Sequence, residues 1–310
     1  ERENMEIVVV GSLNMDLVVK LPQIPKPGET LLGGVFNTFP GGKGANQAVA
    51  SARLGASVTM VGCVGKDAFG KELCDGLAHE GINISHIRMH DELATGVALI
   101  EVDAHGQNSI AVASGANFGL TSSDVSRALK AIGEFNVLVM PLEIPLDVVF
   151  TAAKIAATMN ATVILNPAPA QRLDKSLLEL VDLLIPNEHE IAAMTGTEVT
   201  DGSEIMKNCQ PLFSAGVKNV LVTMGGRGSV LVESDGTENH ILPYHAEVVD
   251  TTAAGDCFVG AMAVALNEKR TYFEAANFAS AAASISVSRE GAQPSLPFRK
   301  EVEQIINTRC

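Results

Sequence analysis

The chain has 310 residues, of which 46% are apolar, and it carries a formal net charge of −14 at pH 7. This length suits one large domain with a sizeable hydrophobic core. Nucleic acids and anionic membranes require a concentrated positive field, so a chain this acidic excludes both as expected partners.

The cysteines indicate a reducing compartment. Their number is odd and they are scattered without a C-x-x-C pair, so neither a disulfide framework nor a zinc site is expected. No apolar run reaches the ~18 to 20 residues of a membrane span, and the amino terminus lacks a signal-peptide core. We therefore expect a cytoplasmic protein. The cysteines are Cys63, Cys74, Cys209, Cys257 and Cys310.

The first predicted element is a strand at residues 6–10, a β-branched run that ends at Gly11 and is typical of a buried parallel strand. Asn14 and Asp16 follow, two residues apart, so on an extended chain they face the same side. An amide and a carboxylate placed in this way can bind adjacent hydroxyl groups. An ordinary Asx turn after the strand is the simpler alternative.

Two segments interrupt the regular pattern. Residues 21–39 are rich in Pro and Gly, and residues 94–113 predict a hairpin with strands at 96–102 and 109–112. We expect them to form a small sheet that projects as a lid, with its strands at approximately 12–40 and 94–113.

The glycine-rich run at residues 40–48 opens a predicted helix that continues to about Leu54. Lys43 and Asn46 are three residues apart, and Gly42 and Asn46 four, so the three share one face of the first turns. Such a face offers donors to hydroxyl oxygens, although a glycine-rich loop before a helix is a weak signal alone. Residues 65–72 have the G-x-x-x-x-G-K spacing of a P-loop, but Glu72 replaces the Ser or Thr that binds magnesium, which excludes that function.

The remaining chain alternates strands and helices, which predicts an α/β fold with a mostly parallel sheet sandwiched by helices, in one domain of residues 1–310. Parallel sheets bind ligands at the carboxyl ends of their strands. Glu143 and Asn187 follow two of the predicted strands, and Asn166 ends a third. The strands are expected near residues 57–61, 136–140, 162–166, 183–186 and 219–224, and the helices near 69–79, 122–132, 146–159 and 202–215.

Asn187 and Glu190 stand three residues apart on one face of a predicted helix, and their oxygen atoms suit magnesium, directly or through water. The alternative is an Asn that caps a helix with acids in its first turn. A zinc site is excluded because His189 has no second His at helical spacing. The turn at residues 223–228 leads into a predicted strand at 229–232, so its glycines do not form a Rossmann fingerprint.

Residues 250–256 combine an anion site with an acid. A predicted strand at 245–249 ends in small residues that start a helix, so the N–H groups near 253–256 should be unpaired and should attract a phosphate. Asp256 would repel a resting phosphate, but it fits phosphoryl transfer as a base that takes a proton from a hydroxyl. The alternative is an acid that only caps the first turn of a core helix.

Two of these runs resemble the signatures of one family. Residues 250–256 are similar to the carboxy-terminal signature of the PfkB, or ribokinase-like, family of sugar and nucleoside kinases, and residues 40–48 to its amino-terminal signature. The chain departs from the usual pattern at Ala253, where most members have Gly. The resemblance extends from Val8 to Pro297. The runs at residues 14–16, 41–48, 166–170 and 291–295 are most similar to family members that phosphorylate D-ribose.

The resemblance implies an ATP-dependent kinase that phosphorylates D-ribose at its 5-hydroxyl, with Asp256 as the general base. Magnesium would lie near Asn187 and Glu190, reached by Glu190 through water. The implied sugar-binding residues are Asn14, Asp16, Gly42, Lys43, Asn46, Glu143 and Asp256. The implied ATP-binding residues are Asn187, Thr223, Gly225, Gly226, Gly228, Gly255 and Ser280, and the anion hole would consist of the N–H groups of Ala253, Ala254, Gly255 and Asp256.

A monovalent-cation activator, K⁺ in most relatives, and a homodimer formed through the lid strands are further implications of the resemblance. The implied cation ligands are Asp250, Thr252, Ser286, Arg289, Gly291 and Ser295.

Two alternatives remain open: a kinase for fructose, deoxyribose or a nucleoside such as adenosine, and a non-catalytic sugar or nucleotide sensor. The 4% aromatic content with no Trp favours a sugar over a nucleoside, because nucleoside pockets more often use stacking rings. The presence of both Asp256 and the Asn187 and Glu190 pair favours an enzyme over a sensor, because a sensor could lack either of these two features.

Overall fold

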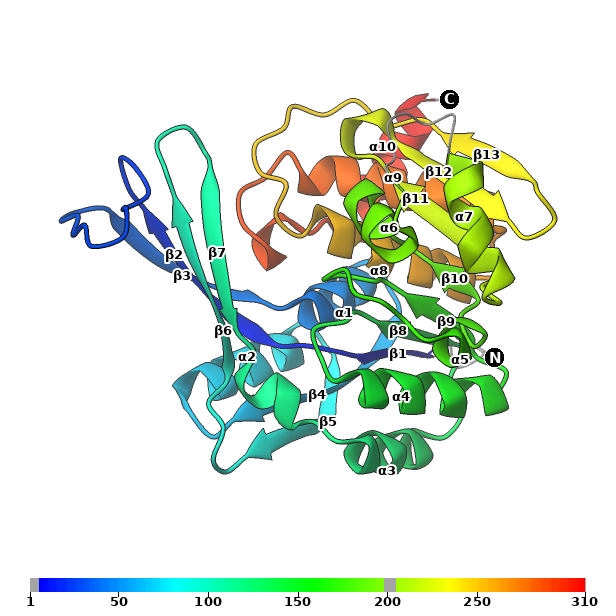
Figure 1. Ribbon diagram of the computed structural model, residues 1–310, viewed down its shortest axis with the longest axis horizontal. Coiled ribbons are helices and arrows are strands. Elements are labelled where there is room, and N and C mark those ends of the chain that lie inside the picture. Colours follow the sequence, from blue (N-terminus) through cyan, green and yellow to red (C-terminus); the bar gives the residue numbers. More distant parts are fainter. Residues whose placement is uncertain (1–5, 198–204, 310) are drawn as a thin grey trace.

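A computed structural model describes residues 6–197 and 205–309 and contains two sheets. The large sheet has nine strands in the order β13-β12-β11-β10-β9-β8-β1-β4-β5, and the small sheet has four in the order β3-β2-β6-β7. The small sheet projects from one side of the helix-covered body (Figure 1). No helix in the described ranges is long and apolar enough to cross a membrane.

The strands of the large sheet are β1 (Glu6–Val10), β4 (Ser57–Gly65), β5 (Asn83–His90), β8 (Val137–Met140), β9 (Thr162–Leu165), β10 (Leu183–Leu184), β11 (Asn219–Thr223), β12 (Ser229–Glu233) and β13 (Glu238–Ile241). The small sheet contains β2 (Asn14–Lys20), β3 (Val35–Gly41), β6 (Gly96–Val102) and β7 (Asn108–Ala113). The helices are α1 (Lys43–Arg53), α2 (Ala68–His79), α3 (Ser122–Ile132), α4 (Leu146–Thr158), α5 (Lys175–Leu178), α6 (Glu188–Thr195), α7 (Ile205–Ser214), α8 (Ala254–Asn267), α9 (Tyr272–Ser286) and α10 (Arg299–Arg309), with short 3-10 turns η1 (Gly115–Gly119), η3 (Gly225–Arg227) and η4 (Gln293–Ser295).

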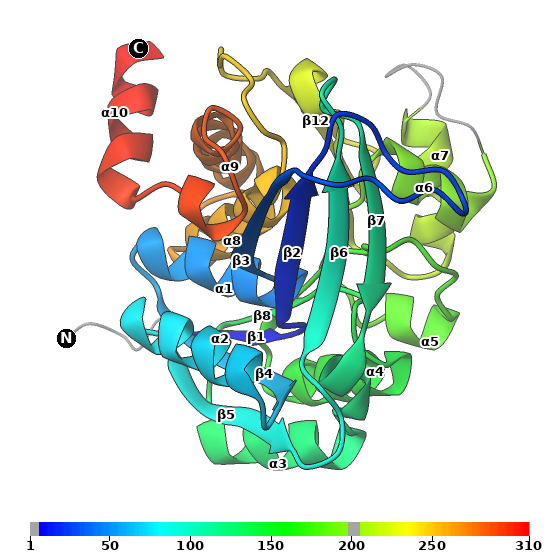
Figure 2. The same cartoon turned by 90° about the vertical axis from the view of Figure 1, so that its left-hand side faces the viewer.

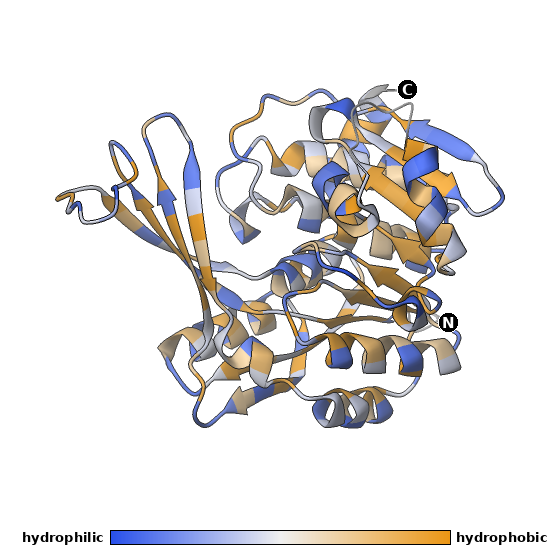
Figure 3. Cartoon of the chain, viewed as in Figure 1, coloured by the Kyte–Doolittle hydropathy of each residue, from blue (hydrophilic) through white to orange (hydrophobic). Residues whose placement is uncertain are grey.

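Strand β1 shows why the large sheet is covered on both faces. Ile7 and Val9 belong to a core formed with α1, α2, α8 and α9, whereas Val8 and Val10 belong to a second core formed with α3, α4 and α7. Successive side chains of a strand point to opposite faces, so a continuous β-branched run needs two apolar layers. The hydrophobic colouring follows these strands in Figure 3. The predicted α/β fold, with a mostly parallel sheet between helices and a separate small sheet, is confirmed.

The small sheet lies beyond the carboxyl end of β1, where the chain passes from β1 into β2, and its four strands are seen side by side in Figure 2. Strand β2 pairs antiparallel with β3 and parallel with β6, and β6 forms the predicted hairpin with β7. In this register Asn14 pairs with Gly41 on one side and with Gly96 on the other. The first residues of β2 therefore lie between the loop that opens α1 and the hairpin.

The structure corrects two expectations. The strand predicted at residues 245–249 does not form, and the chain from 242 to 253 is irregular. Strand β5, at the edge of the large sheet, was not predicted. Of the helix predicted at 202–215, α7 covers Ile205–Ser214, and residues 202–204 lie outside the described ranges. The rejected P-loop spacing, residues 65–72, runs from the last residue of β4 through the cap Asp67 into α2, and its Lys71 is exposed.

Candidate active site

Five charged side chains from five parts of the chain meet where β1 and its parallel neighbours end. The carboxylate of Asp256 raises the pKa of Lys43 most strongly; burial opposes this, and three further carboxylates add to it. Those three belong to Glu143, Glu190 and Asp16. The site thus contains four acidic side chains and one lysine. Because it has more acidic than basic groups, an anionic substrate requires an additional cation in order to bind there.

Asp256, in the first turn of α8, is 5% exposed. Asn46 Nδ2 donates to its Oδ2 at 3.0 Å, and Gln47 Nε2 donates to its Oδ1 at 3.1 Å. Burial raises the pKa of Asp256, and the charge of Lys43 opposes the rise. A raised pKa makes the carboxylate a stronger base than a solvated Asp, as general-base catalysis requires.

The orientation of the Gln47 amide follows from its neighbours. Asn166 Nδ2 donates to the carbonyl of Ile185 at 2.9 Å, which leaves Asn166 Oδ1 to accept from Gln47 Nε2 at 3.2 Å. A backbone carbonyl only accepts, so it fixes both amides. Gln47 therefore presents N–H groups to Asp256, and its buried Oε1 has no hydrogen-bond partner among the residues that the structure describes.

Asp16 and Glu143 lie on the small-sheet side of the cluster. Burial raises the pKa of Asp16 to about 7, with Glu143 and Asp256 adding to the rise and Lys43 opposing it. Glu143 Oε2 accepts from Ser12 Oγ at 2.6 Å and from Lys43 N at 3.1 Å. Glu143 thereby satisfies an N–H group at the start of α1, where the helix dipole favours an anion.

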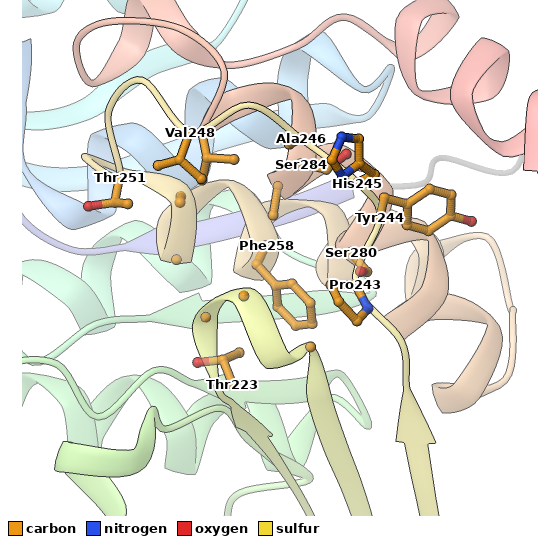
Figure 4. Close-up of a pocket in the computed structure, with 17 residues that line it drawn as sticks. Thr223, Pro243, Tyr244, His245, Ala246, Val248, Thr251, Phe258, Ser280 and Ser284 are labelled. Carbon is orange, nitrogen blue, oxygen red and sulfur yellow. The ribbon is translucent and has the colours of Figure 1, made fainter.

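On the other side of Asp256 lies a cavity of about 550 Å³. Its wall includes six of the seven residues expected at ATP, namely Thr223, Gly225, Gly226, Gly228, Gly255 and Ser280. Figure 4 shows Phe258 between two groups of lining residues, with Val248 and Thr251 on one side and Pro243 and Ser280 on the other. The seventh, Asn187, does not line it but forms a parallel bridge with Thr223.

At the start of α8, one of the N–H groups that were expected to be unpaired, that of Ala254, is hydrogen-bonded. Ala254 N donates to the carbonyl of Thr251 at 3.2 Å. In the described part of the chain, the N–H groups of Ala253, Gly255 and Asp256 donate to no backbone carbonyl. Ala253 has a φ of 59°, in the left-handed region that an alanine adopts at a cost of roughly 1–2 kcal/mol. The glycine usual in the resembled family would adopt it without that cost.

Asn187 and Glu190 form a reciprocal cap. Asn187 Oδ1 accepts from Glu190 N at 2.8 Å, and Glu190 Oε2 accepts from Asn187 N at 2.8 Å. The capping alternative is therefore part of the structure, but the pKa of Glu190 is raised, mainly by burial, and both Lys43 and Asp256 act on it electrostatically. Within the described residues, no group of three or more His, Cys, Asp or Glu side chains is able to hold a metal ion. The residues fit Mg²⁺ that is bound largely by phosphates and water, as is usual for it.

The six expected cation ligands lie in two segments that hydrogen bonds join, residues 250–252 and 286–295. Asp250 Oδ2 accepts from Gly291 N at 2.9 Å, and Oδ1 accepts from Thr252 N at 2.8 Å. Ser286 Oγ and Ser295 Oγ are 2.9 Å apart. Burial raises the pKa of Asp250, but the hydrogen bonds from Thr252 and Gly291 outweigh it, so the pKa is lowered and the group is a carboxylate at neutral pH. Its negative charge fits a cation. Arg289 is able to offer only its carbonyl, because its guanidinium group is positively charged and has no acceptor atom; that group pairs with Glu301.

Ser12 and Asn117 contact expected site residues and were not predicted. Ser12 binds Glu143 and accepts from Gly44 N at 3.3 Å, and Asn117 binds Asn14. Both side chains are buried, Ser12 in the loop after β1 and Asn117 in η1, and tertiary packing alone brings them to the site. A sequence signal exists only at Ser12, a short polar residue that directly follows a strand and a glycine.

Comparisons with known proteins agree on one family. The model of the pfkB family of carbohydrate kinases matches residues 4–299. A ribokinase of Haemophilus influenzae is 43% identical over 300 residues, which cover 97% of this chain and 98% of the relative. The crystal structure of a Thermotoga maritima ribokinase has a TM-score of 0.89 at 39% identity, covering 98% and 99% of the two chains. The structure of an Arabidopsis thaliana ribokinase complexed with ribose and ATP has a TM-score of 0.90 at 34% identity, with the same coverage.

Proposed function

The chain belongs to the pfkB family of carbohydrate kinases, and we propose that it is an ATP-dependent kinase that transfers the γ-phosphoryl group of ATP to the 5-hydroxyl of D-ribose. The observation that carries this proposal is the position of Asp256. It lies among the carboxylates of Asp16, Glu143 and Glu190, while the adjacent Gly255 lines the 550 Å³ cavity. A base between the carboxylate cluster and the cavity is able to reach a sugar hydroxyl on one side and a phosphate on the other.

Ribose would bind against β2 and the start of α1. Asn14, Asp16 and Glu143 offer an amide and two carboxylates, Lys43 and Asn46 offer donors, and Gly42 lets the sugar approach the backbone. Sugar hydroxyls donate and accept at once, so mixed donors and acceptors suit them. ATP would occupy the cavity, with its phosphates towards Asn187, Thr223 and the glycines of η3, and its base towards Ser280.

In the reaction, Asp256 takes the proton of the 5-hydroxyl as the ribose oxygen bonds to the γ-phosphorus and the bond to the β-phosphate oxygen breaks, giving ADP and ribose 5-phosphate. The N–H groups of Ala253, Gly255 and Asp256 stabilise charge on the transferred phosphoryl group, together with the positive end of α8. Lys43 offsets part of the negative charge around the base. Catalysis of this kind relies on positioning and charge stabilisation.

Magnesium would be held near Asn187 and Glu190, through water at Glu190. When bound, it neutralises charge on the phosphates. Asn187 and Glu190 hold each other in place through the cap at the start of α6, and Glu190 interacts electrostatically with Lys43 and Asp256.

The product tests the proposal. Incubation with ATP, magnesium and ribose should yield a phosphomonoester whose phosphorus couples to two methylene protons in its NMR spectrum, because carbon 5 is the CH₂OH carbon. Coupling to one methine proton would place the phosphate on another carbon and overturn the assignment of the 5-hydroxyl.

The KM for ribose should depend on pH through Asp16. Its pKa is raised to about 7, so the carboxyl is neutral below that pH and charged above it. The charged form accepts stronger hydrogen bonds from hydroxyl groups. We therefore expect KM to rise as the pH falls from 8 to 6, approaching about tenfold per unit below 7. The variant Asp16→Asn should have a high KM that stays flat over this range, and an equally steep profile in that variant would assign the effect to another group.

A monovalent cation, K⁺, is proposed as an activator held by Asp250, Thr252, Ser286, Arg289, Gly291 and Ser295. The joined segments 250–252 and 286–295 support it, because Asp250 lies three residues before Ala253 and an ion there would order the start of α8. Turnover should fall severalfold when potassium is replaced by tetramethylammonium at equal ionic strength. Equal activity in the two salts would argue against an activating role.

A homodimer formed through the small sheet is also proposed. Phe36 and Leu99 are more than half exposed on one face of it, and Val35, Ile110 and Val112 on the face that Asp16 shares. Exposed apolar strands with free edges at β3 and β7 favour pairing with a second copy. A monomeric mass by light scattering at micromolar concentration would refute it.

We place the enzyme in the cytoplasm. Cys63, Cys74, Cys209 and Cys257 are free and buried, and such thiols suit a reducing compartment. Recovery of the enzyme in a secreted fraction would contradict this.

A further inference from the structure

Asn117 is a buried side chain that the proposed reaction leaves without a role. It lies in η1, directly after the β6–β7 hairpin, and is 1% exposed. In the described part of the chain, the hydrogen bonds of this side chain go to Leu13, just before β2, and to Asn14, the first residue of β2. Leu13 N donates to Asn117 Oδ1 at 2.9 Å, and Asn117 Nδ2 donates to Leu13 O at 3.1 Å and to Asn14 Oδ1 at 2.7 Å.

These contacts fix the direction of two amides. The backbone N–H of Leu13 only donates and its carbonyl only accepts, so Leu13 determines which end of the Asn117 amide is oxygen and which is nitrogen. Asn117 must then offer an N–H group to Asn14, and Asn14 must offer its oxygen in return. The donor end of Asn14, its Nδ2, is therefore turned away from Asn117.

Asn14 Nδ2 is available to a ligand. Among the residues that the structure describes, no acceptor takes a hydrogen bond from it, and it is not one of the buried nitrogens without a partner. Asp16 shares its face of β2, two residues along the strand. One donor next to one strong acceptor matches a sugar hydroxyl, which accepts from the amide and donates to the carboxylate.

Gly96 leaves room for this arrangement. It pairs with Asn14 across β2 and β6, and a Cβ atom at this position would lie 2.3 Å from both Asn117 Nδ2 and Asn14 Oδ1. Any side chain at position 96 would therefore occupy the space of the amide contact. The hairpin supplies Gly96 at its start, and the turn that follows the hairpin supplies Asn117.

We propose that Asn117 is a positioning residue for sugar recognition, which turns the donor end of Asn14 towards a substrate hydroxyl beside Asp16. The inference deepens the proposed function and rests on its assignment of this pocket to the sugar. It adds that the polarity of the pocket is set by a residue that does not touch the substrate.

The variant Asn117→Asp tests it at mildly alkaline pH, where the new carboxyl is ionised. The carboxylate still accepts from Leu13 N, but it faces Asn14 with an oxygen, so Asn14 must turn over and present its own oxygen beside Asp16. We expect the KM for ribose to rise about 10- to 100-fold, the effect of losing one or two hydrogen bonds, while kcat stays within a few-fold because Asp256 is not contacted. Gly96→Ala, which displaces the same contact, should raise KM as well.

Two comparisons separate positioning from a general loss of structure. Asn136→Asp breaks another Asn–Asn pair, in which Asn136 Nδ2 donates to Asn267 Oδ1 at 3.0 Å before the amino end of β8, and should leave KM unchanged. In an Asn14→Ala background, Asn117→Asp should have no further effect on KM, because it acts through Asn14. An unchanged KM in Asn117→Asp, or additive effects in the double variant, would overturn the inference. A wild-type chain inactive on ribose would instead overturn the proposed function.

Discussion

Replacing Asp256 with Asn should lower kcat by about 10²- to 10⁴-fold, the usual contribution of a general base, while ribose still binds with nearly unchanged affinity. The amide has the shape of the carboxylate but is unable to take a proton from the 5-hydroxyl. Single-turnover ADP release measures the chemical step, and calorimetric titration with ribose measures binding.

The surroundings of Asp256 should tolerate this change. Gln47 is held by Asn166 and keeps an N–H group towards position 256, where the new oxygen accepts it. Asn46 Oδ1 has no hydrogen-bond partner within residues 6–197 and 205–309, so the Asn46 amide is able to flip and accept from the new N–H group. A loss of turnover would therefore report on chemistry.

The control for Asp256→Asn is Asp235→Asn, in the turn between β12 and β13, which removes an exposed carboxylate far from the site and should leave kcat unchanged. Near-normal turnover in Asp256→Asn would remove Asp256 from the mechanism.

Gly42→Ala should raise the KM for ribose about 100-fold and lower the melting temperature by several degrees. Gly42 has a φ of 88°, and a Cβ atom there would lie 2.6 Å from Asn14 N and 2.9 Å from the carbonyl of Ser12. Both neighbours are backbone atoms, so β2 and α1 must separate, at a cost of about 1–3 kcal/mol for the overlap and roughly 1–2 kcal/mol for the left-handed backbone. Asn14, Lys43 and Asn46 then no longer face one ligand. Initial-rate kinetics and thermal unfolding measure the two effects.

Gly28→Ala is the matched control, because Gly28 has a φ of 84° and a Cβ atom there would meet nothing within 4 Å. It imposes the same backbone strain without the overlap and should leave KM unchanged. An equal KM in Gly42→Ala and Gly28→Ala would show that the close approach of β2 to α1 does not shape the sugar pocket.

The strands with continuous β-branched runs could be predicted because both of their faces are buried. Strand β1 is the clearest case: its apolar run continues until Gly11. Strand β5 was missed because, at the sheet edge, most of its residues are exposed or half-buried and its polar residues hide the pattern. Val248 and Val249 gave a false strand signal. They are more than 60% exposed in the irregular segment beside the cavity, where no neighbouring strand pairs with them.

Residues of the candidate site could be predicted from the sequence only where they lie in a recognisable local sequence pattern. The helix starts at Lys43, Glu188 and Ala254 carry such patterns, and the expected Asn46, Glu190 and Asp256 lie in them. The orienting contacts of Asn117 and Asn166 span 103 and 119 residues of sequence, so no local pattern reveals them. The hydrogen bond from Ala254 N to the carbonyl of Thr251 accompanies the left-handed backbone of Ala253. An alanine disfavours that conformation, so the residue type does not predict it.

The most direct test of the central claim is ADP release by the wild-type chain with ATP, magnesium and potassium, measured across ribose, 2-deoxyribose, fructose and adenosine. The account predicts strong turnover with ribose and much weaker turnover with the other three alcohols. Activity with another alcohol alone would keep the phosphoryl-transfer mechanism and contradict the substrate, and no activity on any of the four would contradict the kinase itself.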